Sequence, residues 1–206
     1  MTTIRRELIL LPFLLLGVGL GYITVNYKPQ SDNRVYSAIV ESSPTPMFYP
    51  REVVEKMDSP NGNNVLSMLK NIDNSGVNLK LYTSSYSEED KKLIFEKNGK
   101  FNIDWKIPYN TWSPDNAYFF IEEISAAKSD YYVFSAVGDL FSSGVQFINI
   151  NGLFMQKFPD YIIEEVTGWA SPTLLIVNTK SKENKETSFW FDVQSQDFIQ
   201  LSTYFN

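Results

Sequence analysis

The sequence predicts an all-β domain of about three four-stranded antiparallel repeats, preceded by one N-terminal transmembrane helix. Within 51–206 the dipeptide Ser-Pro occurs at Ser59, Ser113 and Ser171, 54 and then 58 residues apart, and short apolar runs follow each copy. Self-similarity at a nearly fixed period indicates a repeat architecture. An uncharged stretch of 18 residues, 8–25, predicts the membrane helix. A β-sandwich is the alternative arrangement of the same strands.

The composition limits the chemistry that this chain can perform. Cysteine and histidine are both absent, which excludes disulfides, thiolate or imidazole metal sites, Ser-His-Asp triads and Cys-His dyads. We therefore predict no catalytic residues, no cofactor and no metal. The formal charge is −6, and because residues 1–28 contribute +2, the rest of the chain carries −8. An acidic domain repels phosphates, so a nucleic-acid partner is not expected.

The uncharged stretch 8–25 favours a retained signal anchor over a cleaved signal peptide. It is longer than the apolar region of a signal peptide, and no small-x-small cleavage site follows it. Arg5 and Arg6 precede it, so the positive-inside rule leaves residues 1–7 in the cytoplasm and the remainder outside the cell membrane. Gly17 and Gly21 form a G-x-x-x-G pattern, which allows two membrane helices to approach closely as a homodimer.

Residues 26–50 contain Pro29, Pro44, Pro46 and Pro50 and are expected to form an extended spacer. The β-repeat domain then covers 51–206, with units at about 51–100, 101–158 and 159–206. Each unit is expected to hold one strand before its Ser-Pro and three after it. The expected strands are 53–57, 65–69, 77–83 and 92–96; 102–107, 117–121, 131–137 and 145–150; and 162–166, 174–177, 188–193 and 198–204. One helix is expected around 87–93.

Four strands per unit is the pattern of propeller blades. Proline favours the first central position of a turn and serine caps it, so the chain should reverse at Ser59-Pro60, Ser113-Pro114 and Ser171-Pro172. We expect Asp115 to accept hydrogen bonds within its own turn, and Asp115-Asn116 and Asn61-Gly62 to tolerate the positions that follow the proline.

Residues 112–120, WSPDNAYFF, resemble the W-S-P-D-G signature of TolB-type β-propeller repeats, which occur in exported proteins of many bacteria. The copy at 57–62 keeps the proline and glycine but lacks the tryptophan, and the copy at 169–173 keeps Trp169 and Pro172 but lacks Asp and Gly. The chain is also similar to small membrane-anchored bacterial proteins of unknown function. The resemblance implies a propeller-like arrangement and a role in protein contacts.

Three units fall short of the 4 to 8 blades of typical propellers. Either the units form an open stack or sandwich within one chain, or two chains complete each other.

Two sets of side chains are candidates for function. Trp105, Trp112, Trp169 and Trp190 are either a platform for a carbohydrate or peptide or, as large aromatics usually are, core residues. The pairs Glu122-Glu123 and Glu164-Glu165 would suit acid-base chemistry, but adjacent residues of a strand face opposite ways, so exposed strand positions are the simpler interpretation. Residues 71–76 imitate the start of a calcium loop, but Tyr82 stands where a glutamate is required.

The sequence therefore favours a membrane-anchored, extracytoplasmic binding or scaffold module for a protein partner at the cell envelope, and not an enzyme. A carboxylate-type glycan-acting enzyme and an accessory subunit of a membrane complex are the alternatives.

Overall fold

The computed structural model describes residues 50–87 and 90–201 of the chain. The predicted cytoplasmic segment 1–7, the anchor 8–25 with Gly17 and Gly21, and the spacer 26–50 except for its last residue lie outside the described residues. Within the part that is described, no helix is long and apolar enough to cross a membrane.

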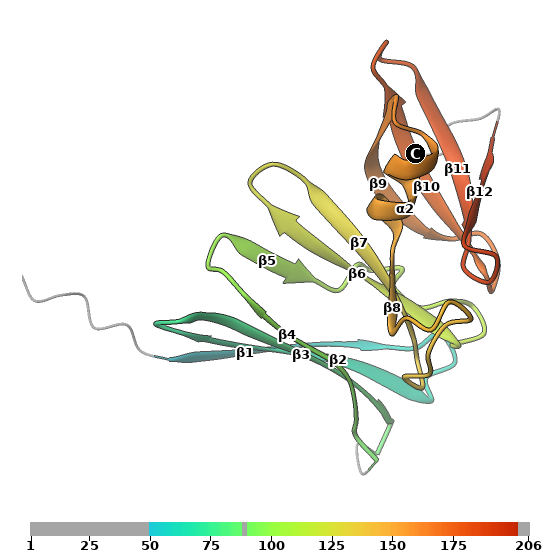
Figure 1. The fold of residues 1–206 in the computed structure, drawn as a ribbon. Helices are drawn as coiled ribbons and strands as arrows, with labels where there is room; N and C mark the ends of the chain where they lie inside the picture. The colour runs from blue at the N-terminus through green and yellow to red at the C-terminus, as the bar shows by residue number, and fades with distance from the viewer. Residues whose placement is uncertain (1–49, 88–89, 202–206) are drawn as a thin grey trace, which may run out of the picture. The chain divides into compact units, whose positions relative to one another are not determined.

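The described residues form three four-stranded sheets and no closed barrel, as Figure 1 shows. All of the pairings are antiparallel. Sheet A holds β1 (Arg51–Asp58), β2 (Asn64–Asp73), β3 (Gly76–Ser85) and β4 (Lys92–Gly99). Sheet B holds β5 (Ile103–Lys106), β6 (Tyr118–Ser125), β7 (Ser129–Ser135) and β8 (Phe147–Asn149). Sheet C holds β9 (Tyr161–Trp169), β10 (Leu174–Ser181), β11 (Glu186–Asp192) and β12 (Asp197–Gln200). The prediction of an all-β domain with three four-stranded antiparallel sheets is confirmed.

The strands form where the sequence alternates or accumulates strand-forming residues. In β3, Val77, Leu79 and Leu81 are buried while Asn78 and Lys80 are partly exposed, as expected for a strand with one wet face. The turn before β3 closes because the backbone N–H of Ser75 donates to Asp73 Oδ1 at 2.7 Å. Local sequence thus accounts for both the strand and the reversal that precedes it.

The helix prediction was wrong. In the stretch 87–93, Lys92 and Leu93 belong to β4, where they pair with Thr83 and Tyr82. The one helix among the described residues is α2 (Ile150–Lys157), which directly follows β8. The predicted strand 145–150 is accordingly shorter, since Ile150 already starts the helix. Asn149 caps it by accepting a hydrogen bond from the backbone N–H of Gly152 at 2.8 Å.

Two hydrophobic clusters join the three sheets, and sheet B contributes to both. The first cluster joins sheet A to one face of sheet B; it holds Leu66, Met68, Leu79 and Leu81 with Trp105, Trp112, Phe119, Ile121, Tyr132 and Phe134. The second joins the other face of sheet B and α2 to sheet C; it holds Phe120, Tyr131, Val133, Ile148, Ile150 and Phe154 with Val166, Leu175, Val177, Phe189, Phe191 and Phe198. Sheet B is therefore the central layer, and burial of each large apolar side chain contributes about 1.5–3 kcal/mol.

Candidate ligand-binding site at the Ser-Pro turns

The first two Ser-Pro turns are built by the same hydrogen bonds. Ser59 Oγ donates to Asn61 Oδ1 at 2.8 Å and accepts from the backbone N–H of Asn64 at 3.0 Å. In the second turn, Ser113 Oγ donates to Asp115 Oδ1 at 2.7 Å and accepts from the N–H of Tyr118 at 2.9 Å. The structure thus places Ser59, Ser113 and Asp115 inside the turns, where each serine hydroxyl bonds the first residue of the strand that follows.

The fourth position of each of these turns has a left-handed backbone. Gly62 has φ 71° and Asn116 has φ 60°, a conformation that glycine and asparagine adopt at the lowest cost. The third turn is shorter: Ser171 is followed by β10 at Leu174, whose carbonyl accepts from the N–H of Ala170 at 2.8 Å. Pro172 is exposed in this turn. The missing Asp and Gly of the third copy therefore correspond to a different, tighter connection.

Two tryptophans connect successive sheets in the same way. Trp112 Nε1 donates to the backbone carbonyl of Met57 at 3.1 Å, and Trp169 Nε1 donates to the carbonyl of Thr111 at 3.0 Å. Met57 and Thr111 both lie two residues before the serine of their own Ser-Pro. Each indole thus reaches back to the equivalent position of the preceding unit. Trp112 is 5% exposed and Trp169 is half-buried, so their role includes a polar contact as well as packing.

Residues of all three units line one groove, which we call the turn groove. Its volume is about 730 Å³. The first unit contributes Met57, Asp58 and Pro60; the second Tyr109, Asn110, Trp112 and Pro114; the third Thr167, Gly168, Trp169 and Ile176. The Tyr109 side chain is 87% exposed. The groove is therefore largely aromatic and apolar, with Asp58 as its one charged side chain.

The wall of the turn groove is fixed by a close approach between sheets B and C. Asn110 Nδ2 donates to the carbonyl of Thr167 at 3.1 Å. Next to this bond, Gly168 has φ 141°, and a Cβ at that position would lie 2.8 Å from Asn110 Cβ. Only glycine combines this backbone with this distance.

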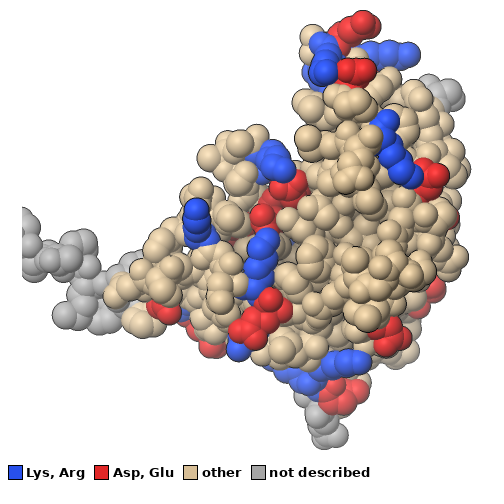
Figure 2. Space-filling view, viewed as in Figure 1, with Lys and Arg blue, Asp and Glu red and all other residues tan. Residues whose placement is uncertain are grey.

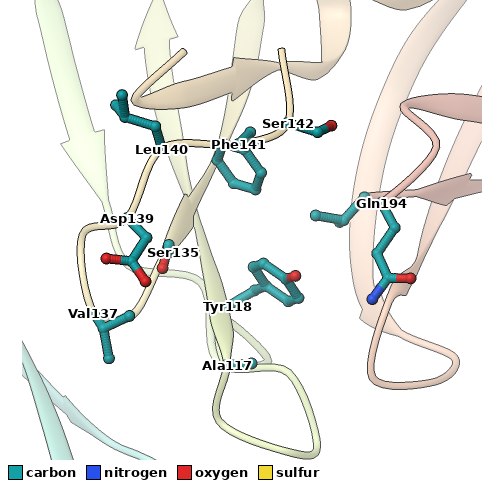
Figure 3. Close-up of a pocket in the computed structure, with 10 residues that line it drawn as sticks. Ala117, Tyr118, Ser135, Val137, Asp139, Leu140, Phe141, Ser142 and Gln194 are labelled. Carbon is teal, nitrogen blue, oxygen red and sulfur yellow. The ribbon is translucent and has the colours of Figure 1, made fainter. Parts of the chain in front are cut away.

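A second cavity lies at the same ends of the strands, between sheets B and C, and Figure 3 shows it. We call it the Tyr118 pocket. It has a volume of about 480 Å³ and is lined by Tyr118, Ser135, Asp139, Phe141, Ser142 and Gln194, together with Ala117, Val137, Leu140 and Val193. The Tyr118 ring is nearly parallel to two neighbouring rings, with its centroid 6.0 Å from that of Phe141 and 6.3 Å from that of Trp169. Sequence reasoning missed this pocket because its residues come from three separate segments.

The Glu122-Glu123 pair divides between two environments, whereas Glu164 and Glu165 line the same cavity. Glu123 Oε2 lies 2.7 Å from Lys97 Nζ, whereas Glu122 lines a cavity of about 380 Å³ that it shares with Glu164, Glu165 and Tyr131. Sheet B supplies Glu122 and sheet C supplies Glu164 and Glu165, so carboxylates of two sheets line this cavity. Glu122 Oε1 accepts from Ser129 Oγ at 2.6 Å and from the Tyr131 hydroxyl at 3.5 Å. Burial, aided by the negative charge of Glu122, raises the pKa of Tyr131.

A buried lysine connects sheets A and B, and the sequence did not single it out. Lys70 is 7% exposed. Its Nζ lies 2.8 Å from Glu55 Oε1 and 3.1 Å from Asp104 Oδ1 and donates to the carbonyl of Trp105 at 2.9 Å. Elsewhere the charges are also mixed, and Figure 2 shows lysine or arginine atoms beside acidic ones at several places on the visible face.

Of the remaining sequence candidates, Trp105 is 1% exposed in the core between sheets A and B. Trp190 is half-buried on β11, on the strand face opposite Phe189 and Phe191. Within the described ranges no group of three Asp or Glu side chains is placed to hold a metal ion. No protein-family model and no curated protein matches this chain, so the likeness of residues 112–120 to TolB-type repeats stays a resemblance.

Proposed function

We propose that this protein is a single-pass, membrane-anchored binding module whose propeller-like array of three sheets holds a protein partner outside the cytoplasm. The turn groove is the observation that supports this proposal. It is formed by equivalent segments of all three units, and an aromatic and apolar lining with few polar groups is typical of ligand-binding sites. Grooves lined by aromatic side chains accept extended peptide segments, which need little ordering to bind.

The propeller-like description is supported by the repeated contacts between sheets. Sheet B packs on its neighbours with both faces, and each step along the array carries the same bond from an indole to a backbone carbonyl. Successive units thus meet in equivalent ways, as blades do.

Site-specific photo-crosslinking in the native envelope tests the groove. A photoreactive phenylalanine analogue at Tyr109, which is 87% exposed in the groove, should capture a defined partner. The same analogue at Tyr86, which is 73% exposed and does not line the groove, is the matched control. Equal products at both positions, or no product at Tyr109, would contradict the proposal.

The absence of cysteine allows a clean test of topology. A membrane-impermeant maleimide should label a Glu183→Cys variant in intact cells and should label a Thr3→Cys variant only after lysis. Glu183 lies in the exposed turn between β10 and β11. Labelling of Thr3→Cys in intact cells would refute the orientation.

A homodimer is a further part of the proposal. Ile176, Trp190 and Ile199 pair with one another across β10, β11 and β12 and form a row on the outer face of sheet C. The row of sheet B that is paired in the same way packs on sheet C. Ile199 is 51% exposed. A second chain, paired through Gly17 and Gly21, would cover this row. The mass of the protein in detergent, measured by light scattering, decides between one chain and two.

The shared cavity of Glu122, Glu164 and Glu165 favours one second candidate, a carboxylate-type glycan-acting enzyme. Such enzymes use two carboxylates on opposite sides of a glycosidic bond. Turnover of a glycan that is lost in both Glu122→Gln and Glu165→Gln, but kept in Glu96→Gln, would establish it.

A further inference from the structure

The Tyr118 pocket offers a chemistry that the turn groove lacks. We propose that it is a saccharide-binding site, which takes one or two hexose units beside the Tyr118 side chain through hydrogen bonds to Asp139, Gln194, Ser135 and Ser142. This inference is independent of the proposed protein contact, because the turn groove is lined by other residues.

The polar side chains of the pocket are available to a ligand. Those of Asp139, Gln194, Ser135 and Ser142 have no hydrogen-bond partner within the described part of the chain. Figure 3 shows the Asp139 carboxylate and the Ser135 hydroxyl on one side of the pocket and the Gln194 amide on the other. Several unused polar groups around an otherwise apolar cavity are the usual arrangement of a small-molecule site.

The kinds of donors and acceptors select the ligand. A carboxylate only accepts, a primary amide both donates and accepts, and a serine hydroxyl does both. Sugar hydroxyls, which donate and accept at once, match this mixture. Phosphate or sulfate needs donors and positive charge, but the lining holds Asp139 and no lysine or arginine. A bare metal ion needs several carboxylates, and no such group exists within the described ranges.

The apolar part of the pocket has the size and surface for a pyranose ring. Its volume of about 480 Å³ lies within the range of about 300–1,000 Å³ for small-molecule sites. Tyr118 is held against Phe141 and Trp169, so its position is set before a ligand arrives. Val137 and Leu140, 57% and 66% exposed, form an apolar rim on which the C–H groups of a sugar can pack.

Both walls of the pocket are preformed. In the loop after β7, the N–H of Gly138 donates to the carbonyl of Ser135 at 3.0 Å. The N–H of Gly144 donates to the carbonyl of Phe141 at 2.8 Å. In the opposite turn, the N–H of Gln194 donates to Asp192 Oδ1 at 3.1 Å. Gln196 Nε2 donates to Ser143 Oγ at 2.8 Å and ties one wall to the other. Binding of a ligand therefore costs little conformational entropy in the site.

Titration of the full-length protein with free disaccharides tests the proposal. The protein is solubilised in a detergent without a sugar headgroup, and maltose, cellobiose and N,N′-diacetylchitobiose are used as probes. Binding is followed by saturation-transfer NMR and by tryptophan fluorescence, to which Trp169 contributes beside Tyr118. We expect saturable binding of at least one disaccharide.

Variants locate the binding in this pocket. The substitutions Asp139→Ala and Gln194→Ala should each weaken it about 3- to 10-fold, the loss for one or two hydrogen bonds. Asp160→Ala is the matched control, because Asp160 is exposed and does not line the pocket. Asp139 and Gln194 lie on exposed segments, so unchanged thermal unfolding will show that both variants fold.

Three results would overturn the proposal. One is the absence of saturable binding for every disaccharide. Another is binding that Asp139→Ala and Gln194→Ala leave unchanged. The third is binding of protonated glucosamine without binding of N-acetylglucosamine or the disaccharides, together with its complete loss in Asp139→Asn; this would show a site for a cation.

Discussion

Replacing Lys70 by methionine tests how sheets A and B are held together. Methionine has nearly the same length and stays apolar at its end, so the change removes the charge while the packing of the stem is kept. Three contacts are lost: those of Nζ with Glu55 at 2.8 Å, Asp104 at 3.1 Å and the carbonyl of Trp105 at 2.9 Å. The buried carbonyl of Trp105 is then left without the donor that Lys70 supplied.

The expected loss of stability depends on how far the groups that bind Lys70 are exposed to water. A charged hydrogen bond to a buried carbonyl contributes about 1.5–3 kcal/mol. The side chains of Glu55 and Asp104 are 37% and 60% exposed, so each ion pair adds only about 0–1 kcal/mol. Methionine avoids the cost of burying a charge, which offsets part of the sum. We expect a net loss of about 2 kcal/mol, or about 4–8 °C in melting temperature for a domain of this size.

The assay is urea unfolding of the full-length protein followed by tryptophan fluorescence. Lys182→Met is the matched control, because Lys182 Nζ lies 2.8 Å from Asp160 Oδ1 while both side chains are more than 70% exposed. This variant should change stability by no more than about 0.5 kcal/mol. If Lys70→Met is as neutral as the control, or stabilises the protein, the reasoning about the buried contact is wrong.

The difference between wild type and Lys70→Met should also depend on pH. Burial by itself would lower the pKa of Lys70, but the hydrogen bonds and charges of Glu55 and Asp104 outweigh it and raise the pKa above 10.5. The pKa of Asp104 is lowered below 3.8: burial opposes the shift, but the N–H of Trp105 and the charge of Lys70 prevail. The stabilisation is therefore present between these values. It should shrink as pH rises through the raised pKa of Lys70, and also as pH falls through the lowered pKa of Asp104.

Three further substitutions and one control, Ser171→Ala, test the turns and the sheet contacts. Ser113→Ala removes two hydrogen bonds of a fully buried hydroxyl and should cost about 1–2 kcal/mol in urea unfolding, whereas Ser171→Ala should cost less than about 0.5 kcal/mol. Trp112→Phe keeps an aromatic ring but leaves the carbonyl of Met57 without its indole donor, so we expect a loss of about 1–3 kcal/mol by the same measurement. Gly168→Ala forces a side chain onto φ 141° and into a contact of 2.8 Å; it should cost at least about 1–3 kcal/mol, seen as a lower melting temperature.

A different result would contradict each of these predictions. Equal losses for Ser113→Ala and Ser171→Ala would show that the turn bonds of Ser113 add nothing to stability. A neutral Trp112→Phe would mean that the indole contributes through packing alone. A stable Gly168→Ala variant would show that sheets B and C can separate at the turn groove without cost.

The strands were predictable because their signals are local. The alternation of Val77, Leu79 and Leu81 with polar residues marks β3 without knowledge of its neighbours, since side chains alternate between the two faces of any strand. The helix α2 was missed because Asn151-Gly152 is typical of a turn. Its formation depends on the cap at Asn149 and on the burial of Ile150 and Phe154 against sheet C.

The candidate sites were less predictable, because their residues are distant in the sequence. The resemblance of residues 112–120 drew attention to the Ser-Pro turns, and two of these turns do share one hydrogen-bond pattern. The convergence of Glu122 with Glu164 and Glu165, the burial of Lys70, and the Tyr118 pocket had no local signal. Each depends on contacts between different sheets.

By itself, then, the sequence determined the number and type of strands, the places where the chain reverses, and the absence of cysteine and histidine chemistry. Periodicity and turn preference act over a few residues, so one chain suffices to show them. Only the tertiary structure decided that sheet B is covered on both faces, that Trp112 and Trp169 each bind the preceding unit, and that residues of all three units line one groove. Those features arise from packing between residues of different units, and no local pattern records which faces meet.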